Sequence, residues 1–243
     1  EVPGWGAGTL FAPLEPGADP YEDATIHDLV KRVSAWLPLG LLTDSSAQID
    51  EALEALRTAI VRVVRDEQLR DRLIGLGNDQ ALSEWIKEVI HERRPFWIAF
   101  IEVDHFKETN DRFGYTNADI LLEKIAEQLK LAATYFSQGL AAFRAHGDEF
   151  YLAGPLAADG LTDVPGALDH VRASIGRMKV RTAKPDDTMR CTVSIGWTSE
   201  AEARGGEREV RHKLELATAA AKHEGRDRVV RFTADLAKLD LVS

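Results

Sequence analysis

Cysteine is nearly absent from this chain of 243 residues, in which Cys191 is the single thiol. One cysteine excludes an internal disulfide framework and a zinc site built from several cysteines, and it favours a reducing, cytoplasmic location. Long hydrophobic runs are also missing, because no stretch approaches the roughly 18 apolar residues of a membrane-spanning helix. The start of the chain at Glu1 has none of the features of a signal peptide. We therefore expect a cytoplasmic protein without a membrane segment.

Basic side chains are in the minority. The chain has 30 Lys and Arg against 40 Asp and Glu, which gives a formal net charge of −10. This excess of acid disfavours nucleic acid as a partner, although local cations can still bind a small anionic ligand. The hydrophobic share of 44% and the charged share of 29% are those of a folded globular protein and exclude a wholly disordered chain. The length fits one large domain or two small ones.

The first 70 residues carry two helical patterns behind an irregular arm. Residues 1–23 contain four Gly and four Pro and predict the arm. A helix is expected from Ala24 to Leu37, and a second from the cap at Ser45 and Ser46. In the second, apolar residues recur at alternating spacings of four and three: Ile49, Leu53, Leu56, Ile60 and Val63. About two heptads of this pattern leave open both a face packed in a small helical bundle and a dimerising stalk. We expect residues 1–70 to form a regulatory or dimerising region.

Residues 71–243 have the pattern of one α+β domain. After a glycine-rich turn at 71–78, we expect helices at 79–92, 117–133, 166–178 and 213–223, and strands at 96–103, 140–144, 150–153, 191–197 and 228–232. From the strand FWIAFIEV (96–103) onward, the order is β-α-β-β-α-β and then a helix and a strand. That order predicts a ferredoxin-like fold with a central, mostly antiparallel sheet flanked by helices.

Two carboxylates stand at the end of the buried strand at 96–103. Glu102 and Asp104 are two residues apart, so both can project from the same face of the sheet. Buried strands rarely carry such groups unless the carboxylates bind something, and the alternative is that one of them caps the next turn.

Two further carboxylates, Asp148 and Glu149, lie in the tight connection HGDEF (146–150). Alone, this segment is typical of a solvated β-turn. The predicted strand order, however, can bring Asp148 to face Glu102 and Asp104 across the sheet. Such a cluster of oxygen ligands suits Mg²⁺ or Mn²⁺, which leave positions for water and phosphate oxygens.

Cations surround these acids in the sequence. Lys222 and Arg226 are four residues apart where a helix runs into Gly225, and Lys107 follows the first strand. They either complement the helix C-terminus or bind the phosphates of a nucleotide. Together with the acids, and without a set of His or Cys ligands, they indicate phosphoryl transfer. They argue against a zinc hydrolase or a serine or cysteine nucleophile.

Five segments resemble, in order and spacing, the motifs of the GGDEF domain family, whose best-known members are diguanylate cyclases. These segments are DRLIGLGN (71–78), IEVDHFKETNDRFGYTNAD (101–119), RAHGDEF (144–150), CTVSIG (191–196) and AKHEGRDRV (221–229). The resemblance implies a ferredoxin-like, palm-like domain. It also implies that two GTP molecules are joined into cyclic di-GMP with release of pyrophosphate, by a homodimer with one GTP bound to each subunit.

The resemblance assigns roles to individual residues. It implies that Mg²⁺ or Mn²⁺ is held by Glu102, Asp148 and the carbonyl of Val103, and that Glu149 assists deprotonation of the attacking 3′-hydroxyl. Lys222 contacts the reacting triphosphate in this scheme. The other substrate contacts implied are Lys107 and Arg226 with the triphosphate, Asn110 and Asp119 with the guanine edge, and His146 and Gly147 beside the base and ribose. An Asn and an Asp together match guanine, whereas adenine leaves Asp119 without a donor.

The chain departs from the family pattern at several positions. Glu102 replaces an Asp and His146 replaces a Gly, while Tyr115, Ala118 and Ala219 replace a His, a Gly and a Tyr. The stretch from Ser137 to Leu140 lacks the R-x-x-D motif of the family's product-inhibition site. Two alternatives to the diguanylate cyclase stay open: a degenerate domain that binds GTP or a cyclic nucleotide without turnover, and an enzyme that uses ATP to form a hybrid cyclic dinucleotide.

Overall fold

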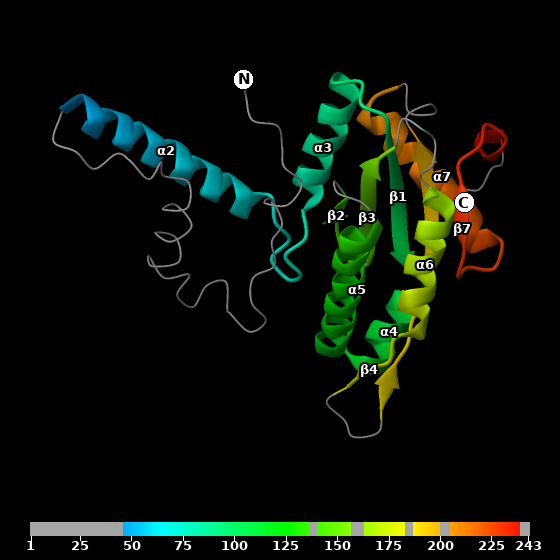
Figure 1. The fold of residues 1–243 in the computed structure, drawn as a ribbon. Helices are drawn as coiled ribbons and strands as arrows, with labels where there is room; N and C mark the ends of the chain where they lie inside the picture. The colour runs from blue at the N-terminus through cyan, green and yellow to red at the C-terminus, as the bar shows by residue number, and fades with distance from the viewer. Residues whose placement is uncertain (1–45, 137–139, 157–162, 183–186, 200–204, 239–243) are drawn as a thin grey trace.

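A five-stranded sheet in the order β2-β3-β1-β6-β7 forms the centre of the protein in the computed structural model (Figure 1). The structure describes residues 46–136, 140–156, 163–182, 187–199 and 205–238. The expected arm at 1–23, the expected helix at 24–37 and positions 137–139 of the missing R-x-x-D motif lie outside the described residues.

The helices and strands follow the predicted order. The strands are β1 (Phe96–Val103), β2 (Ala141–Arg144), β3 (Glu149–Pro155), β4 (Val180–Arg181), β5 (Thr188–Met189), β6 (Val193–Ser199) and β7 (Val229–Arg231). The helices are α2 (Ser46–Gln68), α3 (Asp79–His91), α4 (Phe106–Phe113), α5 (Tyr115–Phe136), α6 (Val164–Arg177), α7 (Glu207–His223) and the 3₁₀ helix η2 (Leu236–Lys238). Strand β1 pairs antiparallel with β3 and β6, β2 pairs antiparallel with β3, and β6 pairs parallel with β7. The predicted mostly antiparallel sheet flanked by helices is confirmed.

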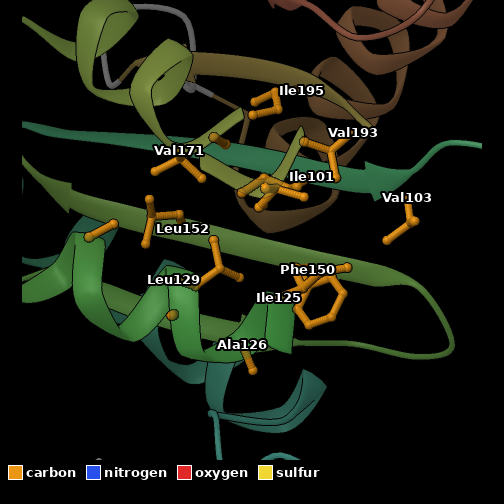
Figure 2. Close-up of a cluster of buried hydrophobic side chains, with 14 of the residues drawn as sticks. Ile101, Val103, Ile125, Ala126, Leu129, Phe150, Leu152, Val171, Val193 and Ile195 are labelled. Carbon is orange, nitrogen blue, oxygen red and sulfur yellow. The ribbon is translucent and has the colours of Figure 1, made fainter. Parts of the chain in front are cut away.

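Strand β1 lies at the middle of the sheet because its apolar residues contribute side chains to the cores on both faces. Ile101 and Val103 belong to the core under α5 and α6, whereas Ile98 and Phe100 belong to the core under α3 and α7. Figure 2 shows the first core, in which side chains of β1, β3 and β6 face those of α5 and Val171 of α6. The protein therefore has three layers, with helices on both faces of the sheet.

Helix α4, strands β4 and β5 and the 3₁₀ helix η2 were not expected from the sequence. Helix α4 has only eight residues, and its two apolar residues, Phe106 and Phe113, stand at its ends and are partly buried against the core, so the segment is too short to show a helical periodicity in the sequence. The two-residue strands β4 and β5 form a separate small sheet and are too short to show an alternating pattern. Helix α5 also begins at Tyr115, two residues earlier than expected, because Gly114 with φ +80° is the only residue between it and α4.

Helix α2 confirms the expected second helix, and it extends away from the sheet in Figure 1. Ala59 and Val63 are buried beside Leu56. Of the predicted seam, Val63 is buried whereas Ile60 is 40% exposed, so the seam is only partly covered within the described chain. Val61 and Val64, which lie outside the seam, are 59% and 46% exposed. An ion pair of 2.7 Å between Arg65 and Glu84 connects α2 to α3. None of the described helices is long and apolar enough to cross a lipid bilayer.

Helix α7 packs directly against the backbone of β6 at Gly196. A Cβ atom at this position would lie 2.4 Å from both the backbone nitrogen and the Oγ1 of Thr218 in α7. Only glycine leaves room for this approach, so Gly196 sets the distance between β6 and the helix that carries Lys222.

We predict that Gly196→Ala lowers the free energy of unfolding by about 1–3 kcal/mol, because the added methyl group overpacks the contact between β6 and α7. The matched control is Gly176→Ala in α6, where a Cβ atom would meet nothing within 4 Å. The control should keep or raise stability by up to about 1 kcal/mol through helix propensity. Urea unfolding of both variants measures the difference, and equal stabilities would contradict the packing argument.

Candidate functional site

The tip of the β2–β3 hairpin carries the HGDEF segment. The backbone N–H of Glu149 donates to the carbonyl of His146 at 2.9 Å, and the N–H of Ala145 donates to the carbonyl of Glu149 at 3.0 Å. Gly147 has φ +52°, a conformation that favours glycine. This closed turn places Asp148 and Glu149 side by side at the end of the sheet.

Arg144 holds the hairpin tip. Its Nε and Nη2 atoms donate to the carbonyl of Gly147 at 2.9 and 2.8 Å, and its Nη1 lies 3.2 and 3.3 Å from the two carboxylate oxygens of Asp71. The Arg144 side chain is only 11% exposed and its contact with Asp71 is partly buried, whereas its bonds to Gly147 lie at the exposed hairpin tip. Asp71 in turn accepts hydrogen bonds from the N–H groups of Leu73 and Ile74. Sequence reasoning quoted Arg144 and Asp71 within motifs but assigned neither a role.

The end of β1 meets this tip. Glu102 stands directly opposite Glu149 in the β1–β3 register, so both side chains lie on the same face of the sheet. The N–H of Val103 donates to the carbonyl of Asp148 at 3.3 Å. In an antiparallel pair, the N–H and C=O of one residue point to the same neighbouring strand, so we expect the Val103 carbonyl on the hairpin side. The groups predicted to bind a metal therefore come together.

The electrostatics of these acids follow from burial and crowding. Burial raises the pKa of Asp148, and the nearby charge of Glu102 raises it further, while Lys222 and Arg144 act in the opposite direction. Burial also raises the pKa of Glu149, partly offset by His146. Lys222 from α7 forms an ion pair with Glu102. Three carboxylates that repel one another are thus balanced by Lys222 and Arg144, and a bound cation would relieve the same repulsion.

The donor set fits a hard divalent cation. Within the described residues, no three His, Cys, Asp or Glu side chains are arranged to hold a metal by themselves. Glu102, Asp148 and the Val103 carbonyl would supply oxygen ligands only and would leave the remaining positions to water or phosphate oxygens. Mg²⁺ and Mn²⁺ accept such a set.

Asp104 does not join this group, contrary to the expectation that Asp148 would face it. Asp104 is 5% exposed, and its carboxylate accepts hydrogen bonds from three donors on other segments. These donors are Thr192 Oγ1 at 2.7 Å, Ser194 Oγ at 2.7 Å and the N–H of Asp227 at 3.1 Å. Asp104 therefore connects the end of β1 to β6 and to the turn before β7.

The residues expected to contact the base and phosphates lie on two short stretches of helix and one turn. Lys107 and Asn110 are one turn apart on α4, which begins directly after β1, and Asp119 lies exposed on the first turns of α5. Arg226 is exposed in the turn after α7. Helix α7 ends at His223, the end expected from the sequence, so Lys222 lies in its last turn and Arg226 in the turn that follows.

A separate cavity of about 740 Å³ lies between α6 and strands β6 and β7. Arg172, Trp197 and Asp227 are among the described residues that line it. The sequence-predicted site residues are not part of its described lining, so it adjoins the candidate site only through the turn before β7.

Comparison with known proteins gives a consistent result. The family model described as "Diguanylate cyclase, GGDEF domain" matches residues 68–228. An uncharacterized protein of Mycobacterium tuberculosis is 30% identical over 184 residues, which cover 72% of this chain and 28% of that protein. Diguanylate cyclase VdcA of Vibrio cholerae is 27% identical over 179 residues, which cover 73% of this chain and 51% of that protein. The chain therefore spans only part of the length of these relatives.

Solved structures share the fold. The coiled coil and GGDEF domain of DgcB from Caulobacter crescentus, crystallised with c-di-GMP, superposes with a TM-score of 0.64 at 24% identity and covers 76% of this chain and 96% of that one. Diguanylate cyclase SiaD from Pseudomonas aeruginosa, in complex with its activator SiaC, gives a TM-score of 0.65 at 24% identity, with 85% of this chain and 74% of that chain covered.

Because the pKa of Asp148 is raised, the free energy of unfolding should depend on pH. The measurement is made with a chelator, so that no metal is bound. Asp148 holds a proton more tightly in the folded chain than in the unfolded chain. Stability is therefore highest below the ordinary pKa of about 4 and falls as the pH rises through the raised pKa. We expect Asp148→Asn to raise the free energy of unfolding at pH 7 and to lose most of this gain at pH 4.

The control for this prediction is Glu123→Gln, which changes an exposed carboxylate on α5. Urea unfolding at both pH values measures the gain in each variant. A gain from Asp148→Asn that is the same at pH 4 and pH 7 would contradict the assigned environment of the carboxyl.

Proposed function

Because the chain belongs to the GGDEF domain family, we propose that it is a diguanylate cyclase that condenses two GTP molecules into cyclic di-GMP and releases pyrophosphate. At the level of the family, the diguanylate cyclases among its relatives support cyclic di-GMP synthesis. The observation that carries the proposal is the meeting of Asp148 and Glu149 at the hairpin tip with Glu102 and Val103 at the end of β1.

The proposed chemistry assigns each of these groups a task. Glu102, Asp148 and the Val103 carbonyl hold Mg²⁺ or Mn²⁺, and the ion supplies charge neutralisation at the transferring phosphoryl group. The 3′-oxygen of one GTP attacks the α-phosphorus of the other, and the bond from that phosphorus to pyrophosphate breaks. Glu149 takes up the proton of the 3′-hydroxyl, a role that its raised pKa favours.

The substrate contacts follow the position of each residue. Lys222 lies beside the acids through its ion pair with Glu102 and reaches the triphosphate from there. Lys107 and Arg226 add positive charge from α4 and from the turn after α7. Asn110 and Asp119 hydrogen bond to the guanine edge, and His146 and Gly147 border the base and ribose at the hairpin tip.

Two copies of the chain face each other in the proposed reaction, since each holds one GTP. We assign residues 1–70 to a regulatory or dimerising region and residues 71–243 to the cyclase domain. The exposed Ile60, Val61 and Val64 of α2 support a dimerising role. The single buried thiol of Cys191 favours a cytoplasmic site for the reaction.

A second candidate is a domain that binds GTP or a cyclic nucleotide without turnover and regulates a partner. The observation in its favour is His146, whose exposed imidazole stands at the hairpin tip where the family has a glycine. Binding of GTP by the unaltered chain without any product would favour this candidate.

We predict that Asp148→Asn reduces product formation by roughly a hundredfold or more, because it removes one of two carboxylates that hold the metal. The variant should remain folded, since Asp148 lies at a hairpin tip and contributes little to the core. Initial rates with Mg²⁺ and GTP, together with circular dichroism, measure both effects. Glu123→Gln is the matched control and should keep its rate. A near-normal rate in Asp148→Asn would contradict the metal assignment.

A further inference from the structure

The turn that joins α7 to β7 has an unusual backbone. Gly225, Arg226 and Asp227 follow one another with φ values of +114°, +63° and +46°. Residues other than glycine adopt this region only at a cost, and consecutive ones need support from their surroundings. The turn therefore depends on contacts that hold it in place.

One contact comes from inside the protein. The N–H of Asp227 donates to the buried carboxylate of Asp104 at 3.1 Å. The same carboxylate is fixed by the hydroxyl groups of Thr192 and Ser194 at 2.7 Å each. A hydrogen bond to an ionised acceptor is about twice as strong as one between neutral groups, and here it is shielded from water. Asp104 is thus a rigid acceptor for the backbone of the turn.

A second contact comes from α6. Nη1 of Arg172 lies 2.6 Å from Oδ1 of Asp227, and Nε of the same guanidinium lies 2.8 Å from Asp169. The Arg172 side chain is 21% exposed and that of Asp227 is 45% exposed, so water weakens this pair more than the bond to Asp104. The two contacts hold Asp227 from opposite ends, one through its backbone and one through its side chain.

We infer that Asp104 and Arg172 are positioning residues that fix the turn at 224–228 and thereby hold Arg226 in place for the triphosphate. The inference rests on the proposed function for the role of Arg226. It assigns a task to Asp104 that differs from metal binding, although Asp104 stands only two residues from Glu102. Lys222 is fixed by α7 and Glu102. The backbone of Arg226 is held by its N–H, which donates to the carbonyl of Ala221 at 3.0 Å, and by Arg228 Nε, which donates to the Arg226 carbonyl at 3.2 Å. Asp104 and Arg172 add contacts at the next residue, Asp227.

The first experiment measures amide hydrogen exchange of the turn in the full chain without nucleotide. Asp104→Ala should speed exchange at Asp227 at least tenfold, because the amide loses its acceptor. Asp104→Asn keeps an acceptor oxygen and should restore most of the protection. Ser194→Ala removes one donor to Asp104 but leaves the acceptor of the Asp227 amide in place, so it should speed exchange at Asp227 less than Asp104→Ala does. Unchanged exchange at Asp227 in Asp104→Ala would overturn the inference.

If Asp104→Ala does not fold, Arg172→Gln still tests the inference. This variant removes the outer contact only and should speed exchange in the turn severalfold. No change in Arg172→Gln would overturn the part assigned to Arg172.

The second experiment measures, by calorimetry in the presence of Mg²⁺, the affinity for 3′-deoxy-GTP, which stands in for GTP but lacks the hydroxyl that the proposed reaction consumes. As a single substitution, Asp104→Ala should weaken binding of 3′-deoxy-GTP about tenfold. Added to Arg226→Ala, it should weaken this binding no further than Arg226→Ala does alone. An equal loss in both backgrounds would show that Asp104 does not act through Arg226 and would overturn the inference. If the unaltered chain binds no 3′-deoxy-GTP, the proposed function fails, while the exchange experiment still decides whether Asp104 holds the turn.

Discussion

The hydrogen bonds from Arg144 to the carbonyl of Gly147 are the interaction on which the candidate site depends. A hairpin tip is normally one of the more mobile parts of a sheet, yet this one carries two carboxylates that must meet the end of β1. Arg144 fixes the tip from within the hairpin itself and connects it to Asp71, at the start of the domain. The site can therefore be preorganised although it lies on a loop.

Consecutive residues at the end of strand β1 have different surroundings and different roles. The alternation of a strand places Glu102 on the face of α7 and Val103 in the core under α5 and α6, while the backbone of Val103 bonds to the hairpin. Asp104, just past the strand, bonds to β6 and to the turn that carries Arg226. Three neighbouring residues thus connect the acids, the core and the cationic side of the site.

The sequence predicted those parts of the structure that depend on local pattern. The apolar run of β1, the alternation in β6 and the Ala-rich face of α7 each indicated the right element, and the family resemblance supplied the candidate site residues. Helix α4 was missed because its eight residues include only two apolar ones, Phe106 and Phe113, which are too few to show a helical period. The partners of Asp104 and the contact of Arg144 with Asp71 were missed because these partners lie 73 to 123 residues away along the chain, beyond the reach of any spacing rule.

The most direct test of the account is the identity of the product formed by the unaltered chain. The purified protein is incubated with Mg²⁺ and equal amounts of GTP and ATP, and the products are identified by mass spectrometry. The account predicts cyclic di-GMP with pyrophosphate, and exclusion of adenine by the acceptor groups of Asn110 and Asp119. A hybrid or adenine-only cyclic dinucleotide, or bound GTP without any product, would contradict it.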